Sequence, residues 1–141
     1  MTALRIDHVH LSVRDREASA AWYADVLGLT CDPSFAVWAE HPAGPLILST
    51  ADGHPALSLF QRGDALPDDN TVAFRFDGEA FLTFMRRLGG LALHDRTGTL
   101  LTTASVIDHD LALSLYFVDP DGNRLEVTTY DVAAVKRRRP S

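Results

Sequence analysis

Apolar and polar residues alternate along several short stretches of the chain, and this two-residue period is typical of β-strands with two unlike faces. We predict strands at 6–13, 45–49, 56–60, 71–76, 113–118 and 124–129. Two further stretches, 30–41 and 100–107, are also predicted as strands.

Two segments between these strands have the pattern of helices. The first begins after Asp15, which can cap a helix, and stops at Gly28. Its apolar face is predicted from Ala18, Trp22 and Val26. The second begins after Asp77 and ends at Gly89–Gly90. Its apolar face is predicted from Phe81, Phe84, Met85 and Leu88.

The order of elements is strand, helix and three strands, and it occurs twice. This order predicts an α+β protein with two tandem βαβββ modules, at about 4–62 and 70–130. Residues 63–69 have linker composition, and 131–141 are predicted as a tail with one helical turn at 132–135. One helix covers only one face of each sheet, so we expect a curled mixed sheet around a cleft in a single domain over 1–141.

The two halves also resemble each other in sequence. A shift of 63 residues matches His8 with Thr71, and a shift of 69 matches Leu57 with Glu126. The small change in shift is consistent with loop insertions between the modules. An internal duplication is therefore expected.

A turn at 119–123 joins the last two predicted strands into a hairpin. Its second strand places Arg124, Glu126 and Thr128 on one face, opposite Leu125 and Val127. A carboxylate between apolar neighbours indicates a strand face that is exposed to solvent or binds a ligand. A glutamate that is only solvated is the simpler of these alternatives. The first predicted strand likewise has a polar face, formed by His8, His10 and Ser12.

The composition of the chain limits the kinds of partner that it can bind. The net charge of −6 argues against nucleic acid as the main partner, because phosphate binding needs a basic surface. The basic run 136–139 is predicted as a solvated, mobile tail. With Cys31 as the only cysteine there is no internal disulfide and no cysteine metal cluster. No apolar run is long enough to span a membrane, so we expect no membrane partner and a cytoplasmic protein.

Three segments in this order resemble the vicinal oxygen chelate superfamily, which includes glyoxalase I, fosfomycin-resistance transferases, extradiol dioxygenases and bleomycin-resistance proteins. They are 6–15, 19–29 and 114–126, and the resemblance extends over roughly 5–130. It implies a cleft in which a divalent metal chelates two oxygens of a small organic molecule. It also implies a homodimer.

The superfamily's metal ligands come from the first and last strand of each module, and the matching positions are His8, Leu57, Thr71 and Glu126. Only His8 and Glu126 are good ligands for Fe, Mn, Ni or Zn, so they are the predicted metal ligands. The equal alternative is a cleft without metal, in which His8 is hydrogen-bonded to Glu126.

The resemblance assigns catalytic roles to Tyr116 and His109, with a tyrosine that only fills the cleft wall as the alternative. His10, Thr71 and Arg124 are assigned to substrate binding, and His10 shares a strand face with His8. The chain is thus expected to be a metal-dependent enzyme with lyase, extradiol dioxygenase or transferase chemistry. The alternative is a metal-free protein that binds or sequesters a small molecule, as bleomycin-resistance proteins do.

Overall fold

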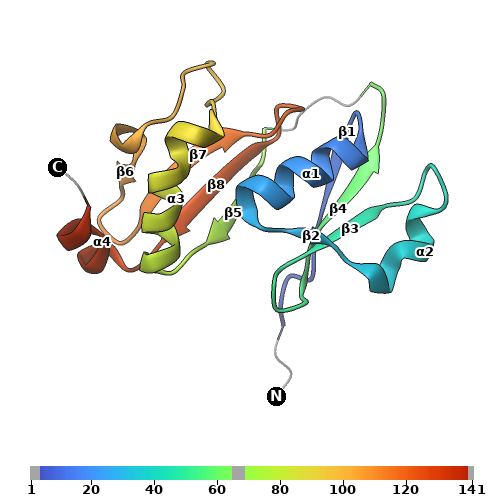
Figure 1. The fold of residues 1–141 in the computed structure, drawn as a ribbon, viewed down its shortest axis with the longest axis horizontal. Helices are drawn as coiled ribbons and strands as arrows, with labels where there is room; N and C mark the ends of the chain where they lie inside the picture. Colours follow the sequence, from blue (N-terminus) through green and yellow to red (C-terminus); the bar gives the residue numbers. More distant parts are fainter. Residues whose placement is uncertain (1–3, 65–68, 140–141) are drawn as a thin grey trace. The chain divides into compact units, whose positions relative to one another are not determined.

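The structure, a computed structural model, describes residues 4–64 and 69–139. The chain forms two compact units that divide between residues 67 and 68, and each is described by itself. Both have the predicted order of strand, helix and further strands, which confirms the α+β class with two βαβββ modules (Figure 1). Of the predicted linker 63–69, residues 65–68 lie outside the described residues.

The first unit contains one mixed sheet. Its elements are β1 (Val9–Val13), α1 (Arg16–Leu27), β2 (Thr30–Cys31), the 3-10 turn η1 (Pro33–Phe35), α2 (Ala36–Ala39), β3 (Leu46–Ser49) and β4 (Pro55–Gln61). The strand order is β1-β4-β3-β2, and β1 runs parallel to β4.

The second unit repeats this arrangement. Its elements are β5 (Thr71–Arg75), α3 (Gly78–Leu91), the 3-10 turn η2 (Thr103–Ser105), β6 (Ile107–Asp108), β7 (Leu113–Val118), β8 (Arg124–Thr129) and α4 (Val132–Arg138). The strand order is β5-β8-β7-β6, with β5 parallel to β8. In each unit, therefore, the first strand pairs with the last one.

The predicted helix starts are confirmed. The side chain of Asp15 accepts a hydrogen bond from Ala18 N at 3.0 Å, and that of Asp77 accepts one from Ala80 N at 2.8 Å. Gly28 ends α1 with φ of 72°, a conformation that glycine adopts without strain. The predicted end of α3 is wrong, because the helix passes through both glycines to Leu91. Glycine inside a helix costs only about 1 kcal/mol, and packing of the same helix face offsets it.

The predicted apolar face of α1 is confirmed at Val26 but is wrong at Ala18. Ala18 is exposed and Trp22 only half-buried, whereas Ser19, Ala20 and Tyr23 are buried. The reason is Arg16, which begins the buried face. Its guanidinium is buried and donates to three backbone carbonyls, those of Ala39, His41 and Gly44. The buried face therefore includes Arg16, Ser19 and Tyr23 as well as Val26.

Two predicted strands are mostly other structure. The segment 30–41 pairs only at its first two residues, because Asp32 caps the 3-10 turn by accepting from Ser34 N at 2.9 Å and Pro33 has no N–H. The segment 100–107 forms η2, where Thr102 and Ser105 make a reciprocal capping box.

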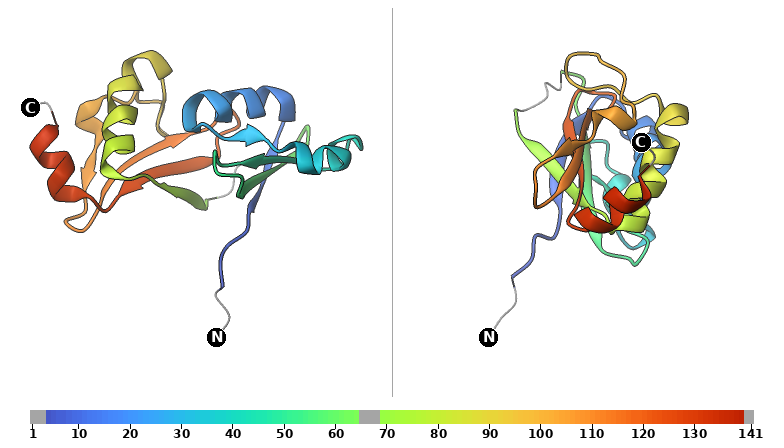
Figure 2. Two further views of the ribbon diagram at one scale, coloured as in Figure 1. Left: turned by 60° about the horizontal axis from the view of Figure 1, so that its bottom comes forward. Right: turned by 90° about the vertical axis from the view of Figure 1, so that its left-hand side faces the viewer.

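The predicted tail is a seven-residue helix, α4, rather than one turn. It lies beside the start of α3 (Figure 2). Asp131 Oδ2 accepts a hydrogen bond from Gly78 N at 2.7 Å, and Arg138 pairs with Glu79. Lys136 pairs with Asp108. The side chains of 136–138 are exposed, as predicted for a solvated basic run, but their backbone is helical as part of α4.

Each sheet has one face packed against its helix, and this face holds the core. In the first unit the fully buried residues include Val13, Tyr23, Leu48, Leu57 and Leu59. In the second they include Phe81, Leu113, Leu115, Phe117, Leu125 and Val127. Figure 1 shows α3 lying across this face of the second sheet. Among the described residues, no helix has the length and apolarity needed to cross a bilayer.

Candidate functional site

The other face of the second sheet is polar and is built from three neighbouring strands. In the registers of β5, β8 and β7, Thr71 lies opposite Arg124, and Tyr116 lies opposite Glu126. The two residues that flank Glu126 on β8, Leu125 and Val127, are fully buried on the helix side. The alternation predicted for this strand is thus confirmed, and it brings four of the candidate residues onto one face.

Glu126 is half-buried and held by a hydroxyl. Ser114 Oγ donates to Glu126 Oε2 at 2.9 Å and lies 3.0 Å from Thr128 Oγ1. Thr128 Oγ1 lies 3.3 Å from the carbonyl of Leu113, to which it donates. This chain of hydroxyls fixes the carboxylate of Glu126 on the polar face.

Tyr116 is the centre of this face. Its hydroxyl lies 3.2 Å from His109 Nε2, and its ring lies under Arg124, whose guanidinium carbon is 4.5 Å from the ring centroid. Partial burial raises the pKa of Tyr116, and the negative charge of Glu126 and a hydrogen bond to it raise this pKa further. Tyr116 therefore keeps its proton at neutral pH and can donate it in a hydrogen bond.

Arg124 is positioned from two sides. Besides its contact with the Tyr116 ring, its Nη1 donates to Thr71 Oγ1 at 3.2 Å. Thr71, at the position where a third metal ligand is expected, is thus engaged by a guanidinium. Five predicted site residues, Thr71, His109, Tyr116, Arg124 and Glu126, lie together in the second unit.

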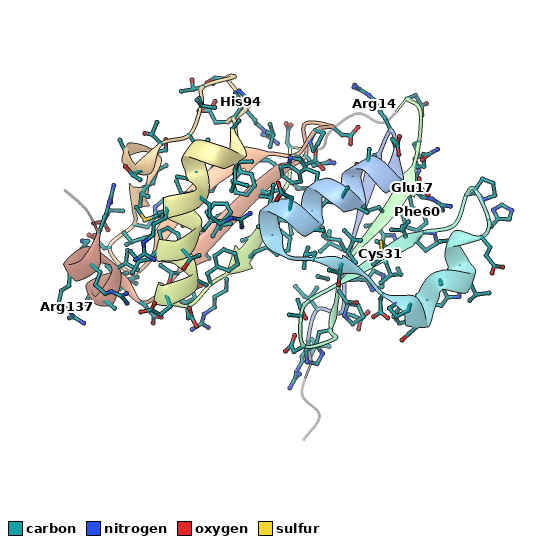
Figure 3. The ribbon with its side chains drawn as sticks, in the orientation of Figure 1. Arg14, Glu17, Cys31, Phe60, His94 and Arg137 are labelled. Carbon is teal, nitrogen blue, oxygen red and sulfur yellow. The ribbon has the colours of Figure 1, made fainter. Side chains whose placement is uncertain are left out.

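His8 and His10 lie in the first unit and contact each other. Their Nε2 atoms are 3.0 Å apart, and their rings stack with centroids 5.0 Å apart. His8 Nδ1 lies 2.7 Å from Asp7 Oδ2, and the ring of His10 lies 4.8 Å from that of Phe60. Phe60 belongs to β4 and is labelled in Figure 3. Asp7 was not predicted, although a carboxylate next to a candidate ligand histidine is a usable signal.

The match of Leu57 with Glu126 is wrong. Leu57 pairs with Val9 on the helix side and is fully buried, whereas Glu126 is on the polar face. Ser58, opposite His10 on the polar face of the first sheet, occupies the corresponding position. Its hydroxyl is buried and has no hydrogen-bond partner.

The candidate metal ligands are few and lie in different units. Among the described residues, no group of three or more His, Cys, Asp or Glu side chains gathers into a metal site. The two predicted ligands are nonetheless each held by a neighbour, His8 by Asp7 and Glu126 by Ser114. Such outer partners orient the ligands in known metal sites.

The chain has two βαβββ units, and each sheet has one covered and one polar face. The polar face of the second sheet carries Glu126 beside Tyr116. These features define a protein of the glyoxalase-like class. Residues 5–127 match the Glyoxalase/Bleomycin resistance protein/Dioxygenase superfamily, and the chain belongs to this family. A comparison with curated proteins finds no match.

Solved structures with the same fold include three named proteins. Oxidase ChaP-H2 is 25% identical with a TM-score of 0.67, covering 91% of this chain and 94% of its own. Lactoylglutathione lyase from Agrobacterium tumefaciens is 20% identical with a TM-score of 0.66, covering 94% and 98%. The fosfomycin resistance protein FosX from Listeria monocytogenes is 14% identical with a TM-score of 0.64, covering 95% and 99%.

Proposed function

We propose that this chain binds a small organic molecule with two adjacent oxygens on the polar faces of its sheets, and acts on it as a metal-dependent enzyme. One observation carries the proposal: Tyr116 contacts both His109 and Arg124 and lies opposite Glu126. These residues provide an acid–base pair, a cation and a carboxylate on one face, which are groups that can bind and polarise the oxygens of such a substrate.

The metal would be held by His8 and Glu126, with its other positions left to water and substrate oxygens. Imidazole and carboxylate suit Fe, Mn, Ni or Zn. When bound, the ion would polarise the substrate oxygens as a Lewis acid. The outer partners Asp7 and Ser114 support this assignment, because each restricts the orientation of one ligand side chain.

The remaining residues have roles that follow from their contacts. Tyr116 keeps its proton and donates a hydrogen bond to a substrate oxygen, and His109 donates a hydrogen bond to the Tyr116 oxygen and so orients it. Arg124 and Thr71 bind the substrate from the neighbouring strands, and His10 contacts it from the first unit. The structural neighbours include an oxidase and a lyase, and one fold hosts several reactions, so the fold does not decide among lyase, dioxygenase and transferase chemistry.

The alternative function is metal-free binding or sequestration of the same kind of molecule. The observation that favours it is Thr71, which supplies a neutral hydroxyl already bonded to Arg124. Ser58, which occupies in the first module the position of Glu126 in the second, is also a neutral hydroxyl.

Metal analysis of protein purified without a histidine tag separates the two functions. We expect bound metal, or restored binding after addition of Fe(II), Mn(II), Ni(II) or Zn(II). Substoichiometric metal with no uptake of any of these ions would reject the metal-dependent enzyme in favour of the binding protein.

A double-mutant cycle tests whether His8 and Glu126 bind one ion. If they share it, His8→Ala and Glu126→Gln each weaken affinity, and the double variant loses less than the sum of the two losses. Additive losses would show that the two residues act at separate places. Asp25→Asn, a change on the exposed side of α1, is the matched control for altered charge.

We further propose that the two modules act as one domain, that the polar faces line a common cleft, and that the protein is a cytoplasmic homodimer. Exposed sheet edges favour pairing with a second copy. Light scattering is expected to give twice the monomer mass of 15.5 kDa, and a mass of one chain at all concentrations would reject the dimer.

A further inference from the structure

A small cavity of about 270 Å³ opens beside the Tyr116–Arg124 pair in the second unit. Its walls include Arg96, Leu101, Ser105 and Ile107 together with these two residues. The volume is at the low end for ligand pockets, so the cavity fits a molecule of about one ring.

The charge of this cavity is set by Arg124. Its guanidinium is fixed by the ring of Tyr116 and by the hydroxyl of Thr71. A guanidinium has five N–H donors in a planar fork, so donors remain for a ligand after the bond to Thr71 is made. Because the group is already held in place, little side-chain entropy is lost when a ligand binds to it.

The other charges at the cavity do not cancel that of Arg124. Asp95 also lines the cavity, but its carboxylate accepts hydrogen bonds from Thr97 N at 2.8 Å, Thr97 Oγ1 at 2.7 Å and Thr99 N at 3.0 Å. These bonds turn the carboxylate toward its own loop, but it keeps its negative charge. Arg96 also lines the cavity, so the one negative charge of Asp95 is set against the two positive charges of Arg96 and Arg124.

The walls between these charges are apolar or carry neutral hydroxyls. Leu101 is buried and Ile107 is partly exposed, and the aromatic ring of Tyr116 faces Arg124. Apolar walls with one fixed cation favour a flat, apolar molecule that carries a single anionic oxygen group.

We propose that this cavity makes the protein selective for small ring compounds with a carboxylate or another oxyanion, which Arg124 receives. The inference rests on the proposed function, since the cavity adjoins the same polar face, and it adds the charge of the substrate. Arg124 is then the residue that determines specificity for an anion over a neutral molecule of equal shape.

Salicylate and its neutral isostere salicylamide are the probes, with binding measured by calorimetry in the presence of EDTA. We expect salicylate to bind at least about tenfold more tightly, because a hydrogen bond to a charged group is worth more than a neutral one. Arg124→Met should abolish this preference, and Arg124→Lys should keep only part of it, since lysine lacks the planar fork.

Arg75 offers a matched control. It also lies over a tyrosine ring in this unit, with its guanidinium carbon 4.7 Å from the centroid of Tyr130, and it is not part of the cavity wall. Arg75→Met should leave both affinities unchanged.

Equal binding of the two probes, or an unchanged preference in Arg124→Met, overturns the inference. Binding of salicylate only when a metal is added, with no effect of Arg124→Met, also overturns it but leaves the proposed metal-dependent function standing. An anion preference that persists in EDTA and depends on Arg124 supports the inference even if the metal proposal fails.

Discussion

The guanidinium of Arg124 lies over the ring of Tyr116, with 4.5 Å between the guanidinium carbon and the ring centroid. The two residues are diagonal neighbours on β8 and β7, because Tyr116 lies opposite Glu126 and Arg124 lies opposite Val118. A cation, a phenol and a carboxylate therefore lie at neighbouring positions on one face of the β7–β8 pair.

Tyr116→Phe is predicted to change the response of stability to high pH. Burial, then the charge of Glu126, raise the pKa of Tyr116 above its usual value, so the folded chain holds this proton at a pH where the unfolded chain loses it. The folded state then binds more protons, and the free energy of unfolding falls as pH rises from about 10. Urea denaturation at several pH values should show a shallower fall for Tyr116→Phe. Parallel slopes for the two proteins would contradict this.

Two buried serines on the polar faces are predicted to respond oppositely to alanine. Ser114 donates to Glu126, so Ser114→Ala should cost about 1–3 kcal/mol of unfolding free energy by removing that donor. Ser58 has no hydrogen-bond partner, so Ser58→Ala should be neutral or stabilise by up to about 1 kcal/mol. Chemical denaturation measures both, and a large loss in Ser58→Ala would show that its hydroxyl is satisfied in solution.

The loop that begins at Asp95 is predicted to loosen in acid. Hydrogen bonds from the Thr97 hydroxyl, then from the backbone N–H of Thr99, lower the pKa of Asp95. The stabilisation is therefore fully present above about pH 4, the usual range for an aspartate, and is lost as pH falls through the lower pKa of the folded state. The amide signals of Thr97 and Thr99 should titrate below pH 4 in nuclear magnetic resonance spectra. In Asp95→Ala they should be unprotected at every pH, and protected signals there would reject the role of the carboxylate.

Thr71→His is predicted to raise metal affinity, if the chain binds metal, by supplying a second imidazole. Thr71 is half-buried on the polar face and not in the core, so a larger ring should be accommodated with little loss of stability. The control Thr71→Val removes the hydroxyl without adding a ligand. A loss of several kcal/mol, typical of overpacking, would show that position 71 has no open space.

The hairpin that carries much of the candidate site could be predicted because local chemistry specifies it. The turn between its strands is held by Asp119, whose Oδ1 accepts from the backbone N–H groups of Asp121 and Asn123 at 2.9 Å. Strict alternation on both sides of that turn then places Glu126 and Tyr116 on one face. The contact of His109 with Tyr116 depends on the short pairing of β6 with β7, which has no sequence pattern of its own.

The error at Leu57 has a local cause. The register of β3 with β4 shifts between Leu48 and Ser49, so the first hairpin differs from the second by an irregular residue. An alignment of the two modules by sequence letters does not detect such a shift, and an error of one residue exchanges the two faces of a strand. The buried face of α1 is only partly predictable for another reason, since the buried Arg16 and Ser19 give no apolar signal.

The pairing of first with last strands also determines the order in which the chain can fold during synthesis. Thr71 and Arg124 are 53 residues apart yet hydrogen-bonded, so the second sheet cannot close until nearly all of its unit has left the ribosome. Each sheet takes all its strands from one unit, and the first is complete at Gln61. The sheet of the first unit can therefore form before β5 is synthesised. The two sheets then form one after the other during synthesis.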